Sequence, residues 1–109
     1  MRFVDTNVLL YAISQAPAER GKAVRANQIL AAGGIGLSVQ VLQEFYVQAT
    51  WASRSDAITH DQAAGLVEAW CRFPVQVTTV EVMGAALATR DRFGISYWDA
   101  AILEAARAL

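Results

Sequence analysis

The chain has 109 residues, of which 55% are hydrophobic and 17% charged, and its nine Lys and Arg residues against ten Asp and Glu residues give a formal net charge of −1. This length provides one modest hydrophobic core and is too short for two. The composition excludes an intrinsically disordered chain. The balanced charge excludes a protein that attracts nucleic acid through a general positive field, so any polyanionic ligand must be held locally.

Cysteine and histidine are scarce. Cys71 is the single cysteine and His60 the single histidine, so neither an internal disulfide nor a zinc site of the usual Cys/His type is possible within the chain. The longest apolar run, residues 8–13, is too short for a secretory signal core or a membrane span. We therefore expect a cytoplasmic protein.

Short apolar segments alternate with longer stretches of helical period, without repeats or long linkers. This alternation predicts one α/β domain over residues 1–109, with a short parallel sheet and helices on both of its faces. The expected strands cover residues 2–5, 35–38 and 74–78. The expected helices cover residues 7–15, 20–32, 39–49, 59–70, 79–93 and 96–109.

Polar residues at the helix starts and glycines at the helix ends support these boundaries. The helix over residues 20–32 is expected to stop at Gly33, and the helix over residues 79–93 at Gly94. Thr or Ser stands at the start of five of the expected helices, where its side chain accepts a hydrogen bond from the first turn. The expected capping residues are Thr6, Ser38, Thr59 with Gln62, Thr78 with Glu81, and Ser96 with Asp99.

Three tryptophans, Trp51, Trp70 and Trp98, occur at helical spacings among apolar neighbours. We expect them in the core or in a dimer contact, with base stacking as the alternative. Cys71 is expected to be a small buried hydrophobic residue.

Three acidic residues stand where a parallel sheet usually carries its functional site, outside the carboxyl ends of the strands. Each also has an ordinary structural explanation. Asp5 suits a helix N-terminus, and Asp99 fits a capping box with Ser96. Glu44 is flanked by glutamines one turn away on either side and is typical of a solvated helix face.

Together, Asp5, Glu44 and Asp99 indicate more than each one alone. Converging carboxylates repel one another, and a divalent cation between them relieves the repulsion. Ligands that are all oxygen atoms favour Mg²⁺ or Mn²⁺ over Zn²⁺. Such an ion suits phosphate chemistry, because it polarises a phosphoryl oxygen and activates a bound water.

Three segments, each with an acid near its centre, occur at residues 4–11 (Val-Asp-Thr-Asn-Val-Leu-Leu-Tyr), 38–45 (Ser-Val-Gln-Val-Leu-Gln-Glu-Phe) and 95–102 (Ile-Ser-Tyr-Trp-Asp-Ala-Ala-Ile). In this order they resemble the PIN domain family, in particular the VapC-type toxins of bacterial toxin–antitoxin pairs. The resemblance spans the whole chain. It implies a three-layer PIN-like fold and a metal-dependent endoribonuclease.

The resemblance also implies roles for particular residues. Asp5, Glu44 and Asp99 correspond to the catalytic and metal-binding acids, with Asn7 as a supporting polar residue and Mg²⁺ or Mn²⁺ as the cofactor. The substrate implied is RNA. The partners implied are a second copy of the chain, as a homodimer, and a cognate antitoxin protein.

The chain departs from the family pattern at its C-terminus. PIN domains normally continue into a fourth strand beside the first and bring a fourth acid, whereas residues 104–109 still have a helical pattern. We expect the chain to be C-terminally incomplete, with the family's last strand or strands missing. Without such a strand, Phe3 and Val4 would lie on an exposed apolar edge.

Two other functions remain open. A phosphoryl transferase of the haloacid-dehalogenase type would use Asp5 as its nucleophile, but Asn7 stands where a second acid is usual, and the only lysine, Lys22, falls in the second expected helix. The main alternative is a catalytically incomplete PIN-like module that binds protein or RNA.

Overall fold

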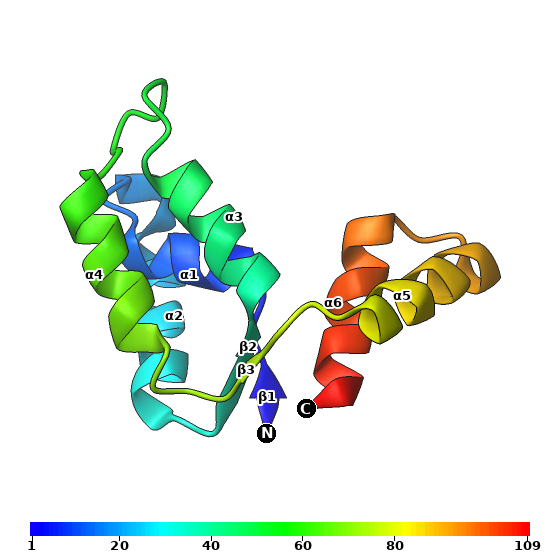
Figure 1. The fold of residues 1–109 in the computed structure, drawn as a ribbon. Coiled ribbons are helices and arrows are strands. Elements are labelled where there is room, and N and C mark those ends of the chain that lie inside the picture. Colours follow the sequence, from blue (N-terminus) through cyan, green and yellow to red (C-terminus); the bar gives the residue numbers. More distant parts are fainter.

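Three short parallel strands and six α-helices make up the computed structural model, which describes residues 1–109 (Figure 1). The sheet has the strand order β1-β2-β3, in which Arg2 pairs with Ile35 and Leu37 with Val75. The strands are β1 (Arg2–Phe3), β2 (Ile35–Ser38) and β3 (Val75–Gln76). The helices are α1 (Thr6–Ile13), α2 (Arg20–Ala32), α3 (Val39–Ala49), α4 (His60–Trp70), α5 (Val80–Phe93) and α6 (Tyr97–Ala108), with a 3₁₀ turn η1 (Pro17–Glu19) before α2.

The mixed α/β class predicted from the sequence is therefore confirmed. The limits of β2 and α2 agree with prediction, whereas β1 and β3 are shorter than the predicted segments. Helix α2 ends at Gly33 (φ 71°), and α5 ends at Gly94 (φ 66°). Both angles lie in the left-handed region that only glycine enters without a steric cost.

Three of the predicted caps are confirmed. The Ser38 hydroxyl accepts a hydrogen bond from the Val41 N–H at 3.1 Å, and Thr59 forms a reciprocal capping box with Gln62. Ser96 accepts a hydrogen bond from the Asp99 N–H at 3.1 Å.

Two predicted caps are wrong by one residue. Asp5, rather than Thr6, caps α1, and Thr79, rather than Thr78, caps α5 through the Val82 N–H. In each pair both residues are able to cap a helix, and the position at which the backbone leaves the strand or loop decides which one does.

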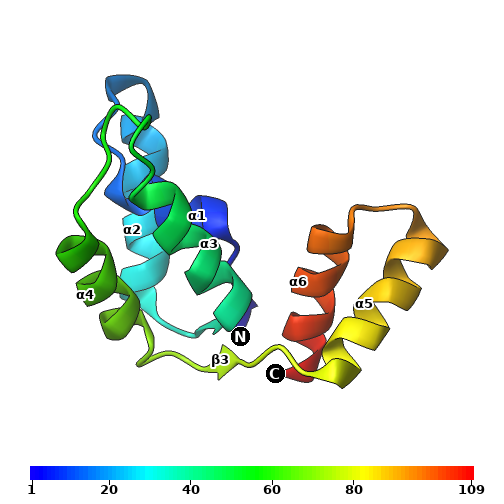
Figure 2. The same ribbon diagram turned by 45° about the horizontal axis from the view of Figure 1, so that its top comes forward.

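The sheet lies between helices α1–α4 on one side and α6 on the other, with α5 packed against the far side of α6 (Figures 1 and 2). The main core forms among Val4, which follows β1, strand β2 and helices α1–α4, and half-buried Ile102 of α6 packs against it. A second, smaller cluster joins α5 to α6 through three alanines. The largest fully buried apolar side chains are Phe45, Leu9, Ile35, Leu37 and Val41.

Helix α6 runs antiparallel to the strands. Leu109, the C-cap residue of α6, reaches the middle of β2, where a Cβ on Gly36 would stand 2.7 Å from Leu109 Cδ1 and 2.7 Å from Met1 Sδ. The two chain termini consequently lie side by side in Figure 1. The opposite end of α6, which carries Asp99, lies toward the carboxyl ends of the strands.

The tryptophans divide into one core residue and two surface residues. Trp70 is buried and packs edge-on against Phe45 at 4.7 Å between ring centroids, as expected. Trp51 and Trp98 are 58% and 59% exposed, so placing them in the core was wrong. Cys71, expected to be buried, is exposed at the C-terminal cap of α4.

None of the helices combines the length and the apolarity that crossing a membrane requires.

Candidate active site

Asp5 is the first polar residue after β1. The preceding residue, Val4, is buried, and its N–H donates to the Gly36 carbonyl at 3.0 Å. The backbone is therefore hydrogen-bonded to β2 up to Val4, and Asp5 is the first residue beyond this contact. The Asp5 side chain is exposed, and its Oδ1 accepts a hydrogen bond from the Val8 N–H at 3.3 Å. The capping interaction occupies Oδ1, while Oδ2 accepts no hydrogen bond from the protein.

Glu44 lies on α3 and is half-buried, so the view of it as an ordinary solvated residue is wrong. The Thr6 hydroxyl donates to Glu44 Oε2 at 2.8 Å, and Gln40 Nε2 donates to Oε1 at 3.2 Å. These contacts hold the carboxylate against the first turn of α1. Because Thr6 follows Asp5 directly, they also bring the elements that carry Asp5 and Glu44 together.

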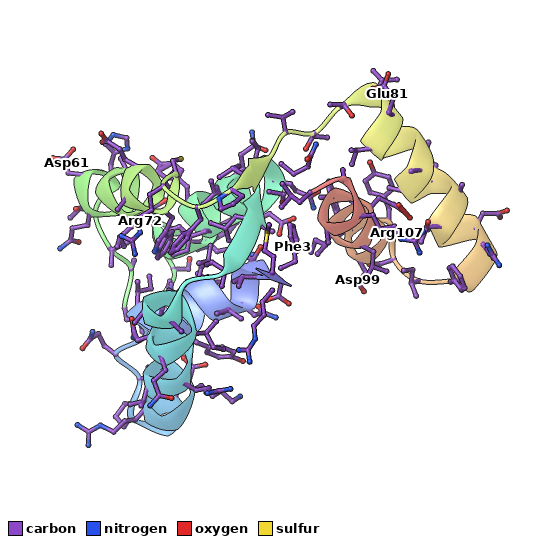
Figure 3. The ribbon with its side chains drawn as sticks, turned by 90° about the horizontal axis from the view of Figure 1, so that it is seen from below. Phe3, Asp61, Arg72, Glu81, Asp99 and Arg107 are labelled. Carbon is purple, nitrogen blue, oxygen red and sulfur yellow. The ribbon has the colours of Figure 1, made fainter.

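Asp99 comes from the opposite side of the sheet. It lies exposed in the first turn of α6, where its backbone N–H is capped by Ser96. The antiparallel direction of α6 places it toward the same end of the sheet as Asp5. In Figure 3, Phe3 of β1 lies on the side of the sheet that α6 covers, and Asp99 is carried by that helix.

Asp5, Glu44 and Asp99 do not form a closed metal cage in this structure. No group of three or more His, Cys, Asp or Glu side chains lies close enough together to hold a metal ion. The contact between Thr6 and Glu44 joins α1 to α3, and no corresponding contact reaches Asp99. The available donors are nonetheless all carboxylate oxygens, which is the chemistry that Mg²⁺ and Mn²⁺ prefer.

Thr6 and Gln40 have roles that differ from those their sequence positions predict. Thr6 was expected to cap a helix, but it is buried and its hydroxyl serves Glu44 instead. The position of Gln40, one turn before Glu44, is typical of a solvated helix face, but in the structure Gln40 donates to Glu44. A glutamine at i−4 from a glutamate is also able to donate to it along the helix, and that spacing was the signal available. Asn7, the expected supporting residue, is exposed and its side chain forms no hydrogen bond with the protein.

The model of the PIN domain family matches residues 2–109 of this chain, which includes all three acids and the residues that hold them. The chain belongs to the PIN domain family. PIN domains are generally nucleases, and they typically use divalent metal ions. A comparison with curated proteins gave no significant match.

In this PIN domain, the three acids come from three different segments. Asp5 is the N-cap residue of α1, Glu44 lies in the second turn of α3, and Asp99 lies in the first turn of α6. The start of each of these helices is set locally, by the capping residues Asp5, Ser38 and Ser96. Their spatial relation depends on how α3 and α6 pack against the sheet from its two sides.

Proposed function

We propose that this PIN domain is a metal-dependent endoribonuclease that hydrolyses RNA phosphodiester bonds. The observation that carries the proposal is the hydrogen bond of 2.8 Å between Thr6 and Glu44. A half-buried carboxylate that receives two side-chain hydrogen bonds, next to an exposed aspartate at a strand end, is held in one orientation. Such an arrangement is typical of a site in which oxygen ligands are preorganised.

Asp5, Glu44 and Asp99 are the proposed catalytic and metal-binding residues, and Asn7 is the supporting polar residue. Asp5 and Asp99 are exposed and accessible to an ion, while Glu44 is oriented by Thr6 and Gln40. Bound Mg²⁺ or Mn²⁺ supplies Lewis-acid polarisation of a phosphoryl oxygen and lowers the pKa of a water. The protein's own contribution is to fix Glu44 and, through the Val8 N–H, Asp5.

The substrate class follows from the charge. A chain with a net charge of −1 lacks the general positive field that attracts the phosphate backbone of a duplex, so binding depends on local contacts. Selective recognition of RNA usually targets unstacked bases in loops and single strands. We therefore assign single-stranded or looped RNA as the substrate.

We also propose the VapC-type role, with a homodimer and a cognate antitoxin as partners. Support comes from the three acid-centred segments and from an unpartnered apolar stripe on α5. Val80, Met83 and Leu87 are 75%, 43% and 53% exposed, while Val82 and Ala86 on the other face of α5 are buried. Exposed apolar side chains along one helix face are typical of a protein contact.

The test is a calorimetric titration of Mn²⁺ into the wild-type chain and the variants Asp5→Asn and Asp99→Asn. Asp61→Asn is the matched control, because Asp61 is also an exposed acid in the first turn of a helix. We expect the wild type and the control to bind the ion, and each of the other two variants to lose binding and metal-dependent RNA cleavage. Unchanged cleavage by a folded Asp5→Asn variant would contradict the mechanism.

One observation favours a second candidate, a catalytically incomplete PIN module that binds RNA or protein. This observation is that no three acidic side chains converge closely enough to hold an ion. If the wild type binds RNA but neither binds Mn²⁺ nor cleaves, the binding module replaces the nuclease.

A further inference from the structure

Trp98 lies in the first turn of α6, immediately before Asp99, and is 59% exposed. An indole ring of this size usually finds apolar cover in a folded domain. Of the two exposed tryptophans, Trp98 is the one next to a proposed site residue, whereas Trp51 follows the last turn of α3.

The face of α6 that carries Trp98 can be followed along the helix. Ile102 packs against the main core, and Leu109 lies against Gly36 of β2. Trp98 precedes Ile102 by four residues, and residues four apart in an α-helix share a face. Trp98 thus belongs to the sheet-facing stripe of α6, one turn beyond the point at which that stripe is covered.

The direction of α6 shows where this uncovered end lies. Because the C-terminal end of α6 meets β2 near the chain's N-terminus, its N-terminal end lies toward the carboxyl ends of the strands (Figure 1). Asp5 leaves β1 at the same end of the sheet. Trp98 and Asp99 therefore lie at the end of α6 that is directed toward the same end of the sheet as Asp5.

We propose that Trp98 is a stacking platform for an unpaired base of the RNA substrate, next to the bond that is cut. The inference rests on the proposed function, for which it supplies a substrate-binding residue. A nucleobase is a flat aromatic ligand, and stacking on an indole gives affinity without positive charge. This suits a chain with a net charge of −1, in which no general basic surface is available to hold RNA.

The surroundings of Trp98 favour a base over an apolar protein surface. Asp99 follows Trp98 directly and is itself exposed. A partner that covered the indole would bring the adjacent carboxylate into a low-dielectric contact, which is costly without a paired cation. A nucleotide instead covers the ring with its base and leaves its phosphate free to reach the site.

The Trp98 ring is also braced on one side. The half-buried Tyr97 ring meets it edge-to-face, with centroids 5.2 Å apart and an interplanar angle of 76°. Tyr97 packs against the small cluster of Ala86, Ala100 and Ala101 between α5 and α6. Because the Trp98 side chain is already ordered in the free protein, less side-chain conformational entropy is lost when a base binds to it.

The test is binding of a fluorescently labelled, short single-stranded oligoadenylate, measured by anisotropy in the presence of a chelator so that the probe is not cut. We compare the wild type with Trp98→Ala and Trp98→Phe, and use Trp51→Ala as the matched control, because Trp51 is equally exposed. Circular dichroism verifies that each variant is folded. Substitution of an exposed side chain leaves the core intact.

We expect Trp98→Ala to weaken binding about 10-fold, in line with the loss of one stacked base, and Trp98→Phe to retain most of the affinity. Trp51→Ala should bind like the wild type. In metal-containing buffer, Trp98→Ala should raise the KM for cleavage of single-stranded RNA more than it lowers kcat.

Other results would overturn the inference. The first is that Trp98→Ala binds the probe with wild-type affinity, and the second is that Trp51→Ala loses as much affinity as Trp98→Ala. The third is that the wild type does not bind the probe. The fourth is that the only defect of Trp98→Ala is weaker self-association in sedimentation. Failure of the nuclease is a separate result. If the wild type does not cleave RNA but binds the probe through Trp98, the stacking site stands and the proposed function does not.

Discussion

The Thr6 hydroxyl is one of two side-chain donors that orient the Glu44 carboxylate; Gln40 is the other. Thr6 is the first residue of α1 and is buried, and it donates to a carboxylate 38 positions further along the chain. The neighbouring residue Asp5 is exposed and caps the same helix. Two adjacent residues thus differ in role: Thr6 orients Glu44 on another helix, and Asp5 caps α1 while its side chain stays exposed to solvent.

We predict that Thr6→Val, which keeps the shape but removes the donor, lowers RNA cleavage by about 10-fold and the free energy of unfolding by about 1.5–3 kcal/mol. A hydrogen bond to a charged group is worth roughly that much, and half-buried Glu44 loses one of its two donors. Cleavage assays and urea denaturation measure the two effects. Thr6→Ser retains the hydroxyl and should recover most of both, and equal losses in the Ser and Val variants would contradict this role.

Asp56 shows a charge used for structure. Its Oδ2 accepts a hydrogen bond from the Gln15 backbone N–H at 3.2 Å, and its Oδ1 lies 2.9 Å from Arg54 Nε. The Gln15 N–H, with a smaller contribution from Arg54, lowers the pKa of Asp56 below its usual value of 3.8. The ionised carboxylate therefore fastens the loop between α3 and α4 to the end of α1.

We predict that Asp56→Asn reduces stability near neutral pH and that this difference shrinks as the pH falls below about 4. The pKa of Asp56 is lower in the folded than in the unfolded protein, so ionisation stabilises the fold above the unfolded value of 3.8, and this stability is lost as pH falls through the folded pKa. Urea denaturation of both proteins across this pH range measures the difference. A difference in the free energy of unfolding that stays constant with pH would contradict the stabilising role of the ionised Asp56 carboxylate.

At the scale of elements, α5 and α6 form a pair with a polar contact inside it. Thr89 of α5 donates to Glu104 of α6 at 2.6 Å, and both residues are buried. Arg107 lies 3.7 Å from the same carboxylate oxygen. A buried carboxylate with so few partners depends strongly on each of them.

We predict that Thr89→Val lowers the free energy of unfolding by about 2 kcal/mol, because it leaves the buried Glu104 carboxylate without its hydroxyl donor. The double variant Thr89→Val/Glu104→Leu should recover part of that loss, since both polar partners are then replaced by apolar groups. Denaturant unfolding of the wild type, Thr89→Val, Glu104→Leu and the double variant completes the cycle. Strictly additive losses would show that the two side chains are not coupled.

The face that α5 buries was not evident from its sequence. The helix has apolar residues on two sides, and the structure buries the side with Val82 and Ala86 while Val80 and Leu87 remain exposed. Small residues on both helices allow a close contact, and the cluster between them consists of alanines. Which side is buried depends on α6, and that information lies outside the segment itself.

At the scale of the whole molecule, α6 connects two packed units. It shares the alanine cluster with α5 on one side and inserts Ile102 into the main core on the other. Figure 2 shows the α5–α6 pair away from helices α1–α4, and α6 contacts β2 and β3. The position of Asp99 relative to Asp5 therefore depends on how α6 docks.

We predict that Ile102→Ala lowers the free energy of unfolding by about 1–2 kcal/mol, less than for a fully buried isoleucine because Ile102 is half-buried. Hydrogen exchange should become faster in α5 and α6 while β2 and α3 keep their protection. Ala108→Gly, a change at the last residue of α6, is a control for simple fraying of the helix. Uniformly faster exchange in all helices would contradict separate docking of the pair.

The sequence alone determined the α/β class, the full extent of β2 and α2 and most of the helix caps, because hydrophobic period, capping residues and glycine act within a few residues of one another. It also indicated the three acids, from their positions near expected strand ends and helix starts. The tertiary structure decided the partners of Glu44, the exposure of Trp98 and the buried face of α5. Each of these depends on which side chains a distant part of the chain brings into contact. Such contacts contribute to stability only after the elements have packed, so the local sequence does not reveal them.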